Sequence, residues 1–141
     1  MLPLKLREIA KAIHATCPVA IPDVEISEIC TDSRDVKPGS LFVALCGERF
    51  DGHAFIKSAL EKGAAFAVAQ KEGDYGSGHI LYVPTTRQAF LDLAGLYRSK
   101  FSPKVLAVTG SVGKTTTREM MAAVVKSQYK TLKTENNLNN E

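Results

Sequence analysis

The sequence feature that most limits the possible folds is a glycine-rich segment placed between a short apolar run and a helical run. Residues 105–108 are Val-Leu-Ala-Val, which predicts a buried parallel strand, and a helix is predicted after Lys114. A tight turn between a strand and a helix directs several backbone N–H groups toward one point, where the positive end of the helix dipole also lies. Residues 109–117 are therefore predicted to bind phosphate groups.

The side chains that follow this turn suit a nucleoside triphosphate. Lys114 would reach the β- and γ-phosphates, and the hydroxyl of Thr115 would bind Mg²⁺. The pattern is G-x-x-G-K-T, because Val108 stands where the full phosphate-loop pattern has its first glycine. The alternative is a surface turn before a helix that carries an incidental lysine. The predicted phosphate-binding residues are Gly110, Ser111, Val112, Gly113, Lys114, Thr115 and Thr116.

Length and composition indicate a globular protein with one domain, or with one small domain and part of another. The chain has 141 residues, of which 45% are hydrophobic and 23% are charged. No apolar run reaches the roughly 18–20 residues that span a bilayer, and charges begin at Lys5, too early for a secretory signal. We therefore expect a cytoplasmic protein with no membrane partner. The three cysteines and three histidines show no disulfide or zinc spacing, so we expect buried, reduced thiols.

Charge is distributed unevenly along the chain. Residues 1–84 carry 9 Lys and Arg against 11 Asp and Glu, whereas residues 85–141 carry 9 against 4. A basic C-terminal part suits a polyphosphate ligand. Its basic residues are not interleaved with aromatic residues on which bases could stack, so we expect no nucleic-acid partner.

Residues 1–84 alternate predicted strands and helices, which is typical of a small α/β domain. Apolar residues at helical spacing predict a helix over residues 3–15 that begins at Pro3. Asp51 is predicted to cap a helix that ends at Gly63. The predicted strands cover residues 24–31, 40–45, 64–69 and 80–83.

Residues 85–103 are predicted to be a helical connection between two domains. Thr85 and Gln88 have the spacing of a capping box. Apolar residues at positions i, i+3, i+4 and i+7 then predict a helix over residues 86–99. The second domain would begin at residue 104.

Residues 104–141 predict one strand–helix–strand unit. Its second strand is placed at residues 129–132, and Met120, Met121 and Val124 are predicted to form the buried side of its helix. Two strands and one helix bury too little apolar surface to be stable alone. The unit is therefore expected either to pack on the preceding domain or to belong to a longer protein of which this chain is a truncated form.

Three blocks of the sequence resemble the Mur ligase family of peptidoglycan synthesis, and within it the MurF type. Thr-Asp-Ser-Arg at residues 31–34, followed by residues 39–45, is similar to the DSR…G-x-LF-x-AL signature of the uridine-binding domain. Residues 47–55 resemble its G-x-x-x-DGH-x-F continuation. Residues 109–117 resemble the ATP loop TG(S/T)xGKT(S/T), which lacks the early glycine in this family too. Residues 137–141 favour the MurF type over the MurE type.

The resemblance implies an α/β fold in which residues 1–84 form a small mixed α/β domain that binds a uridine nucleotide. Residues 85–103 would be the connecting helix, and residues 104–141 the first strand, phosphate loop and helix of an incomplete P-loop ATPase domain. A complete ligase of this type uses ATP and Mg²⁺ to join UDP-N-acetylmuramoyl-tripeptide to D-alanyl-D-alanine through an acyl phosphate. The chain lacks most of two domains of such an enzyme, so we expect it to be inactive alone.

The resemblance also assigns roles to individual residues. Lys114, Thr115 and Glu141 match catalytic positions, and Thr115 and Glu141 would hold Mg²⁺. If they hold no ligand, the loop at residues 31–34 would be only a polar turn in which Arg34 pairs with Asp35. The loop at residues 47–52 would then be only a solvent-exposed loop tip. The uridine diphosphate would lie against Thr31, Ser33, Glu48, Arg49 and Phe50, and the muramoyl-peptide side against Asn137, Asn139 and Asn140.

Three alternatives to a MurF-type ligase stay open. One is a MurE-type ligase, which adds the third amino acid of the peptide, and another is a non-catalytic module that holds a UDP-linked precursor. The third is a small phosphate-loop kinase or regulatory NTPase. The uridine-type loops, and the lack of a Walker-B-like apolar run ending in Asp, argue against this third alternative. We expect a monomer, with the open strand edge of residues 104–141 as the surface for a dimer if one forms.

Overall fold

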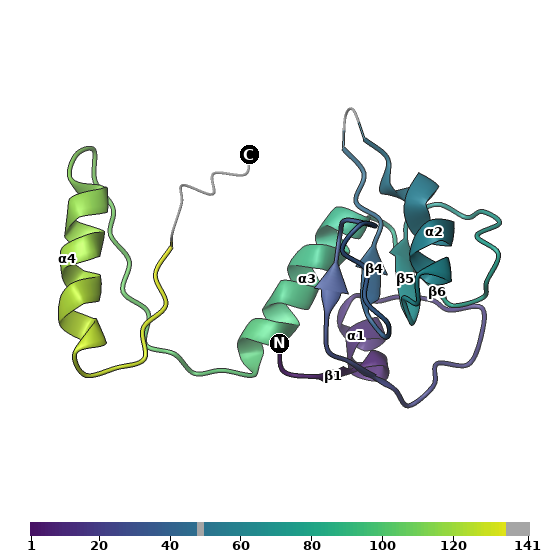
Figure 1. Cartoon of the computed structure of the whole chain (residues 1–141), viewed down its shortest axis with the longest axis horizontal. Helices are drawn as coiled ribbons and strands as arrows, with labels where there is room; N and C mark the ends of the chain where they lie inside the picture. Colours follow the sequence, from purple (N-terminus) through teal and green to yellow (C-terminus); the bar gives the residue numbers. More distant parts are fainter. Residues whose placement is uncertain (48–49, 135–141) are drawn as a thin grey trace. The chain divides into compact units, whose positions relative to one another are not determined.

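The computed structural model of the chain describes residues 1–47 and 50–134, and it divides into two compact units (Figure 1). The first unit is Met1–Ser102 and the second is Pro103–Glu141. The two are described separately below. Among the described residues, no helix is both long enough and apolar enough to cross a bilayer.

The first unit is built on a four-stranded parallel sheet in the order β3-β4-β5-β6. Successive residues of a strand point to opposite faces, so each strand supplies two layers of core. Leu41, Val43 and Phe66 face α1 and α3, whereas Phe42 and Ala67 face α2. Helices therefore cover both faces, which confirms the predicted α/β fold (Figure 1). The strands are β3 Ile29–Cys30, β4 Leu41–Val43, β5 Phe66–Ala69 and β6 Ile80–Tyr82, and the helices are α1 Leu6–Ala12, α2 Ile56–Glu61 and α3 Thr86–Ser99.

The first 30 residues differ from the prediction at two points. Pro3 does not begin the helix, because Leu4–Lys5 forms strand β1, which pairs antiparallel with β2, Glu25–Ile26. The single strand predicted over residues 24–31 is also wrong, since its first half is β2 and its second half is β3 of the parallel sheet. The two halves pair with different strands, β2 with β1 and β3 with β4, so one continuous strand cannot make both pairings.

The turn before α2 is capped as predicted. The Asp51 carboxylate accepts a hydrogen bond from His53 N at 3.0 Å and begins the 3₁₀ turn η1, Gly52–Phe55, which leads into α2. Only glycine fits at the start of this turn, because a Cβ on Gly52 would lie 2.7 Å from the carbonyl oxygen of Leu45. Gly63 follows the last turn of the helix with φ of +104°, a conformation that favours glycine.

Helix α3 is capped by a side chain from a distant loop, and the capping box predicted for Thr85 and Gln88 is wrong. The Oε1 atom of Gln70 accepts from the backbone N of Thr86 at 2.9 Å and from its hydroxyl at 3.1 Å. The Gln88 side chain instead donates to Asp92 at 2.8 Å. The first N–H of the helix is thus satisfied by the residue that follows β5, which ties α3 to the sheet.

The second unit contains the predicted helix but neither predicted strand. Helix α4 spans Lys114–Lys126, whereas residues 105–108 and 129–132 have no strand pairing within the described residues. A strand needs a hydrogen-bonded neighbour, and without one Val105 is 70% exposed. The predicted buried side of the helix is wrong for the same reason, because Met120 and Val124 are exposed and only Ala122 on this helix is buried. Met121 is half-buried.

The packing of α3 predicts how two leucines on this helix differ. Leu93 is 1% exposed and lies in the core between α1 and the sheet, whereas Leu91 is 58% exposed. Leu93→Ala is expected to lower the free energy of unfolding by about 2–5 kcal/mol, because it leaves a cavity. Leu91→Ala is the matched control and should change it by less than about 0.5 kcal/mol. Urea denaturation measures both, and equal effects would show that α3 does not share this core.

Candidate functional site

The carboxyl ends of the parallel strands bring three loops to one edge of the first unit. Thr31 follows β3 directly, the segment 44–52 follows β4, and Gln70 follows β5. Ligands of open parallel sheets bind beyond this edge, because the loops that leave it are free to shape a site. The residues predicted to contact the uridine diphosphate all lie in the first two of these loops.

The loop after β3 is held by a pair of opposite charges. Asp32 accepts from the backbone N of Arg34 at 2.8 Å and pairs with its guanidinium at 2.5 Å. Arg34 therefore pairs with Asp32 and not with Asp35, which corrects the pairing considered above. These hydrogen bonds lower the pKa of Asp32 to about 2. Thr31 and Ser33 are half-buried, and the carbonyl of Ser33 accepts from the Lys62 ammonium at 2.7 Å.

The loop after β4 turns back on itself and presents an aromatic side chain. Gly47 N donates to the carbonyl oxygen of Phe50 at 2.8 Å, which fixes the backbone of Phe50. The ring of Phe50 is exposed and stacks on the ring of Phe55. Glu48 and Arg49, the other predicted contacts in this loop, lie outside the described residues.

Asp51 and the buried imidazole of His53 tie this loop to the end of β5. Asp51 Oδ1 accepts from His53 N and lies 2.6 Å from His53 Nδ1, while its Oδ2 accepts from Lys71 Nζ at 2.5 Å. The backbone N of Gln70 donates to His53 Nε2 at 3.0 Å. Because a backbone N–H can only donate, Nε2 is unprotonated and Nδ1 carries the hydrogen that bonds to Asp51. The Lys71 ammonium and the two N–H groups of His53 hold the pKa of Asp51 well below its usual 3.8.

This arrangement does not fit a metal ion, although three ligand types meet there. The donor atoms of Cys46, Asp51 and His53 lie within 4.8 Å of one another. Both ring nitrogens of His53 are already committed, one as an acceptor from Gln70 and the other as a donor to Asp51. A metal on Nδ1 would move the proton to Nε2, where it would face the N–H of Gln70. The cluster is therefore a hydrogen-bond network.

Gln70 and Lys71 join this edge of the sheet although neither was predicted as a site residue. The sequence pattern could have indicated them, because both residues come directly after an apolar strand, and the carboxyl ends of parallel strands meet at one edge of the sheet. Asp51 was predicted only as a helix cap, and its contact with Lys71 is a long-range pairing that local spacing does not indicate.

The predicted phosphate loop of the second unit is a glycine turn that leaves the start of α4 open. Gly110 and Gly113 have φ of +148° and +78°, where glycine is favoured. Gly113 is the N-cap, no side chain caps the helix, and the first intrahelical bond runs from Thr117 N to Gly113 O at 2.9 Å. The preceding N–H groups are therefore available to an anion. Lys114 Nζ donates to the Gly110 carbonyl at 2.6 Å, which places the ammonium over the same turn.

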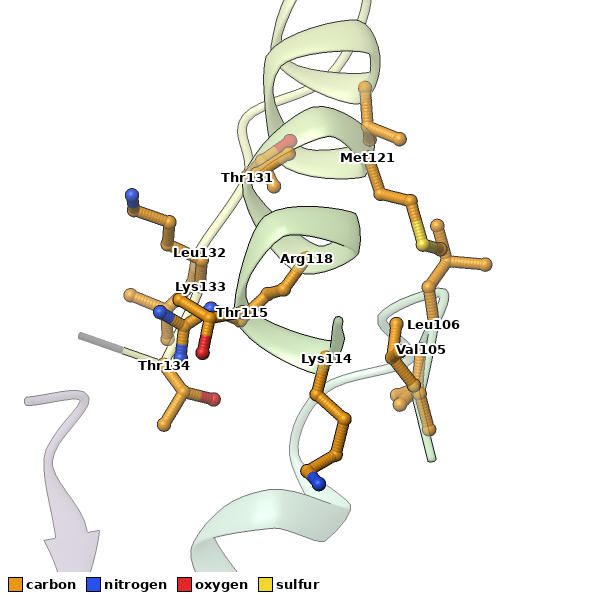
Figure 2. Close-up of a pocket in the computed structure, with 14 residues that line it drawn as sticks. Val105, Leu106, Lys114, Thr115, Arg118, Met121, Thr131, Leu132, Lys133 and Thr134 are labelled. Carbon is orange, nitrogen blue, oxygen red and sulfur yellow. The ribbon is translucent and has the colours of Figure 1, made fainter. Parts of the chain in front are cut away.

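A cavity of about 550 Å³ lies along α4 in the second unit. Lys114 and Thr115 line it at the first turn, and residues 105–108 and 131–134 line it from either side of the helix (Figure 2). The Thr115 side chain, the predicted Mg²⁺ ligand, therefore adjoins an open space next to the loop. The other predicted residues of this unit, Glu141, Asn137, Asn139 and Asn140, lie outside the described residues.

Comparison with known proteins decides the family. The model of the Mur ligase family, catalytic domain, matches residues 25–129 of this chain. The chain belongs to the Mur ligase family. The UDP-N-acetylmuramoyl-tripeptide–D-alanyl-D-alanine ligase of Buchnera aphidicola subsp. Acyrthosiphon pisum is 41% identical over 140 residues, which cover 99% of this chain and 30% of that protein. Relatives named as 2,6-diaminopimelate ligases also match, at 40% and 37% identity.

Solved Mur ligase structures agree with this fold. A crystal structure of MurF from Acinetobacter baumannii matches with a TM-score of 0.84 at 37% identity, covering 98% of this chain and 30% of that one. MurF from Thermotoga maritima in complex with ADP matches with a TM-score of 0.64 at 38% identity, covering 72% and 23%. The chain therefore spans about a third or less of the length of these Mur ligases.

The network around His53 predicts one tautomer for its ring. Near pH 7, Nδ1 should carry the hydrogen and Nε2 should be unprotonated, because the N–H of Gln70 occupies the Nε2 lone pair. Long-range ¹H–¹⁵N correlation spectra distinguish the two tautomers. His14 and His79, both exposed, serve as references in the same spectrum. A hydrogen on Nε2 of His53 would contradict the network.

The lowered pKa of Asp51 predicts a loss of stability in acid. Folding favours the ionised carboxylate of Asp51. The contribution of this carboxylate to the free energy of unfolding is therefore present above pH 3.8 and is lost as the pH falls toward the lowered pKa. Asp51→Asn should therefore be less stable than the wild type near pH 7, and its stability should fall less steeply below about pH 4. Thermal unfolding as a function of pH measures this, with Asp92→Asn as the control. Parallel curves for wild type and Asp51→Asn would contradict the assignment.

Proposed function

We propose that the chain is the N-terminal segment of a MurF-type ligase, in which the two units hold different nucleotides. The first unit would hold the uridine end of UDP-N-acetylmuramoyl-tripeptide, and the loop before α4 would hold the phosphates of ATP. The observation that carries the proposal is the open start of α4, where a left-handed Gly113 leaves N–H groups without a side-chain cap beneath the Lys114 ammonium. The ADP complex of the Thermotoga maritima relative supports the nucleotide assignment.

The reaction proposed for the whole enzyme needs phosphate chemistry because a carboxylate is a poor acylating agent. The γ-phosphoryl group of ATP would pass to the terminal carboxylate of the tripeptide, which gives an acyl phosphate and ADP. The amine of D-alanyl-D-alanine would attack the acyl carbon, forming the amide and releasing phosphate. Catalysis would depend on positioning and on stabilising negative charge, which backbone N–H groups and Lys114 are placed to do.

Magnesium would be held by Thr115 and Glu141, and when bound it would neutralise charge on the phosphates. Thr115 fits this role, because its side chain lies at the first turn of α4 and lines the cavity there. Asn137, Asn139 and Asn140 would face the muramoyl-peptide side of the substrate. The roles of these residues are part of the same proposal as the phosphate-binding roles of Lys114 and of the loop before α4.

The proposed domain assignment keeps the predicted limits. Residues 1–84 would be the uridine-nucleotide domain, residues 85–103 the connecting helix, and residues 104–141 the start of the ATPase domain. The packing of α3 into the first core indicates that the connecting helix moves with the uridine domain. We propose a monomer, because the predicted contacts to each nucleotide come from a single unit, and both ligands suit a protein of the cytoplasm.

The phosphate loop is tested by two substitutions on the same helix. Lys114→Met removes the ammonium over the loop and is expected to weaken ATP binding by at least about tenfold, as hydrogen bonds to charged groups contribute roughly 1.5–3 kcal/mol. Lys126→Met, at the other end of α4, is the matched control and should bind ATP like the wild type. Isothermal titration with ATP and Mg²⁺ measures both, and equal affinities would contradict the phosphate loop.

Binding of UDP, the uridine end of the substrate UDP-N-acetylmuramoyl-tripeptide, tests the first unit independently, and it should be the same in both lysine variants. The chain alone is expected to form no amide product when ATP, Mg²⁺, this substrate and D-alanyl-D-alanine are supplied together. Turnover would show that the 141 residues suffice for catalysis and would overturn the proposal that they are one segment of the machinery.

A further inference from the structure

The cavity along α4 is lined by three cationic side chains, Lys114, Arg118 and Lys133. Within the described residues, no carboxylate lines it. Arg118 and Lys133 are half-buried, where a charge interacts more strongly than it does in open solvent. A cavity lined by charges of one sign concentrates ions of the opposite sign. The proposed function uses Lys114, so Arg118 and Lys133 are two further cations beside the phosphate loop.

Arg118 is placed to reach the first turn of α4. It lies three residues after Thr115, so the two side chains share one face of the helix (Figure 2). Its Cα lies about 6 Å along the helix axis from that of Lys114. Because long side chains on a helix lean toward its N-terminus, the Arg118 side chain extends over the turn that carries Thr115.

The guanidinium of Arg118 has more donors than acceptors around it. Its Nη2 lies 3.1 Å from Glu119 Oε1, whereas the buried Nε has no hydrogen-bond acceptor among the described residues. Consecutive residues of a helix do not face each other, and an exposed ion pair contributes little, so the pair with Glu119 is weak. Nε and Nη2 lie on one edge of the guanidinium, and that edge matches two oxygens of a phosphate.

Glu119 links Arg118 to the second cation of the cavity wall. Its Oε2 accepts from the Lys133 ammonium, and its Oε1 accepts from Arg118. These hydrogen bonds, that of Lys133 foremost, lower the pKa of the Glu119 carboxyl. The Glu119 side chain is 45% exposed and does not line the cavity. One carboxylate outside the cavity therefore holds two cations that line it.

We propose that Arg118 and Lys133 form a phosphoryl subsite beside the phosphate loop, which takes the terminal phosphate of ATP when Glu119 releases the two cations. The inference rests on the proposed ATP site and adds to it the residues that distinguish ATP from ADP. The N–H groups of the loop hold phosphates that both nucleotides carry. Arg118 supplies the two-donor edge for the third phosphate, and Glu119 competes with the nucleotide for it.

A comparison of ATP with ADP provides the first test. Arg118→Gln removes the charge and the two-donor edge, so ATP should bind at least about tenfold more weakly, whereas ADP binding should change less than about twofold. Lys126→Gln removes a cation from the same helix outside the cavity lining and is the matched control. Isothermal titration of the 141-residue chain with each nucleotide and Mg²⁺ measures the affinities. Thermal unfolding verifies that both variants are folded.

Glu119 provides a second test, with an effect of opposite sign. Glu119→Gln keeps the size of the side chain but removes the competing charge, so ATP should bind about two- to fivefold more tightly, the range expected for a weak exposed ion pair. A Glu119 that only tied α4 to residue 133 would leave ATP affinity unchanged or lower in this variant, and that result would contradict the proposal. ADP binding by the same variant verifies that its phosphate loop is intact.

Inorganic phosphate distinguishes the terminal phosphate of ATP from a free anion. At constant ionic strength, phosphate should compete with ATP but not with ADP, because only ATP fills the subsite. Equal competition with both nucleotides would place the phosphate in the loop and would overturn a separate subsite. Unchanged ATP affinity in Arg118→Gln, or an equal loss of ATP and ADP affinity, would also overturn it.

Each of these contrary results leaves the proposed function intact, because the wild type would still bind nucleotide through the loop. Failure of the wild type to bind either ATP or ADP is a different result. It would overturn the proposed ATP site of the second unit and the phosphoryl subsite with it.

Discussion

The first unit depends on one chain of partly buried hydrogen bonds that runs from Asp51 through His53 to Gln70 and on to Thr86. A buried polar group without a partner is costly in a low-dielectric interior, so each member of the chain fixes the next. The chain joins the loop after β4, the end of β5 and the first turn of α3. These bonds hold together the segments that form this edge, although the segments lie far apart in the sequence.

The two units offer ligands different kinds of contact. The first presents side chains at the carboxyl edge of a covered sheet, with aromatic rings and a lysine–aspartate pair. The second presents the main chain, since the turn at Gly113 leaves N–H groups open and brings Lys114 over them. Its apolar side chains, such as Val105 and Leu106, lie exposed along the cavity. Such a surface is typical of part of a larger core, in line with relatives that are about three times longer.

Local sequence patterns predicted the elements that depend on local chemistry. The cap at Asp51, the end of α2 at Gly63 and the glycine turn before α4 each follow from one residue and its neighbours. The strand at 24–31 and the cap of α3 could not be predicted this way, because they are decided by distant partners, Leu4 and Gln70. The prediction of strands in the second unit failed because the neighbouring strands that they would pair with are not among the described residues. At the candidate site, motif resemblance predicts Phe50 as a contact, whereas Lys71 joins this edge only through its long-range bond to Asp51.

The central claim is that one chain carries two separate nucleotide sites, one in each unit. Hydrogen exchange of the full chain, with UDP and with ATP and Mg²⁺ in turn, tests it most directly. The uridine ligand should slow exchange at the carboxyl edge, around residues 50–53 and 70–71, and ATP should slow it at residues 110–116. Each ligand should leave the other region unchanged. Protection of the same region by both ligands, or of the phosphate loop by the uridine ligand alone, would contradict the account.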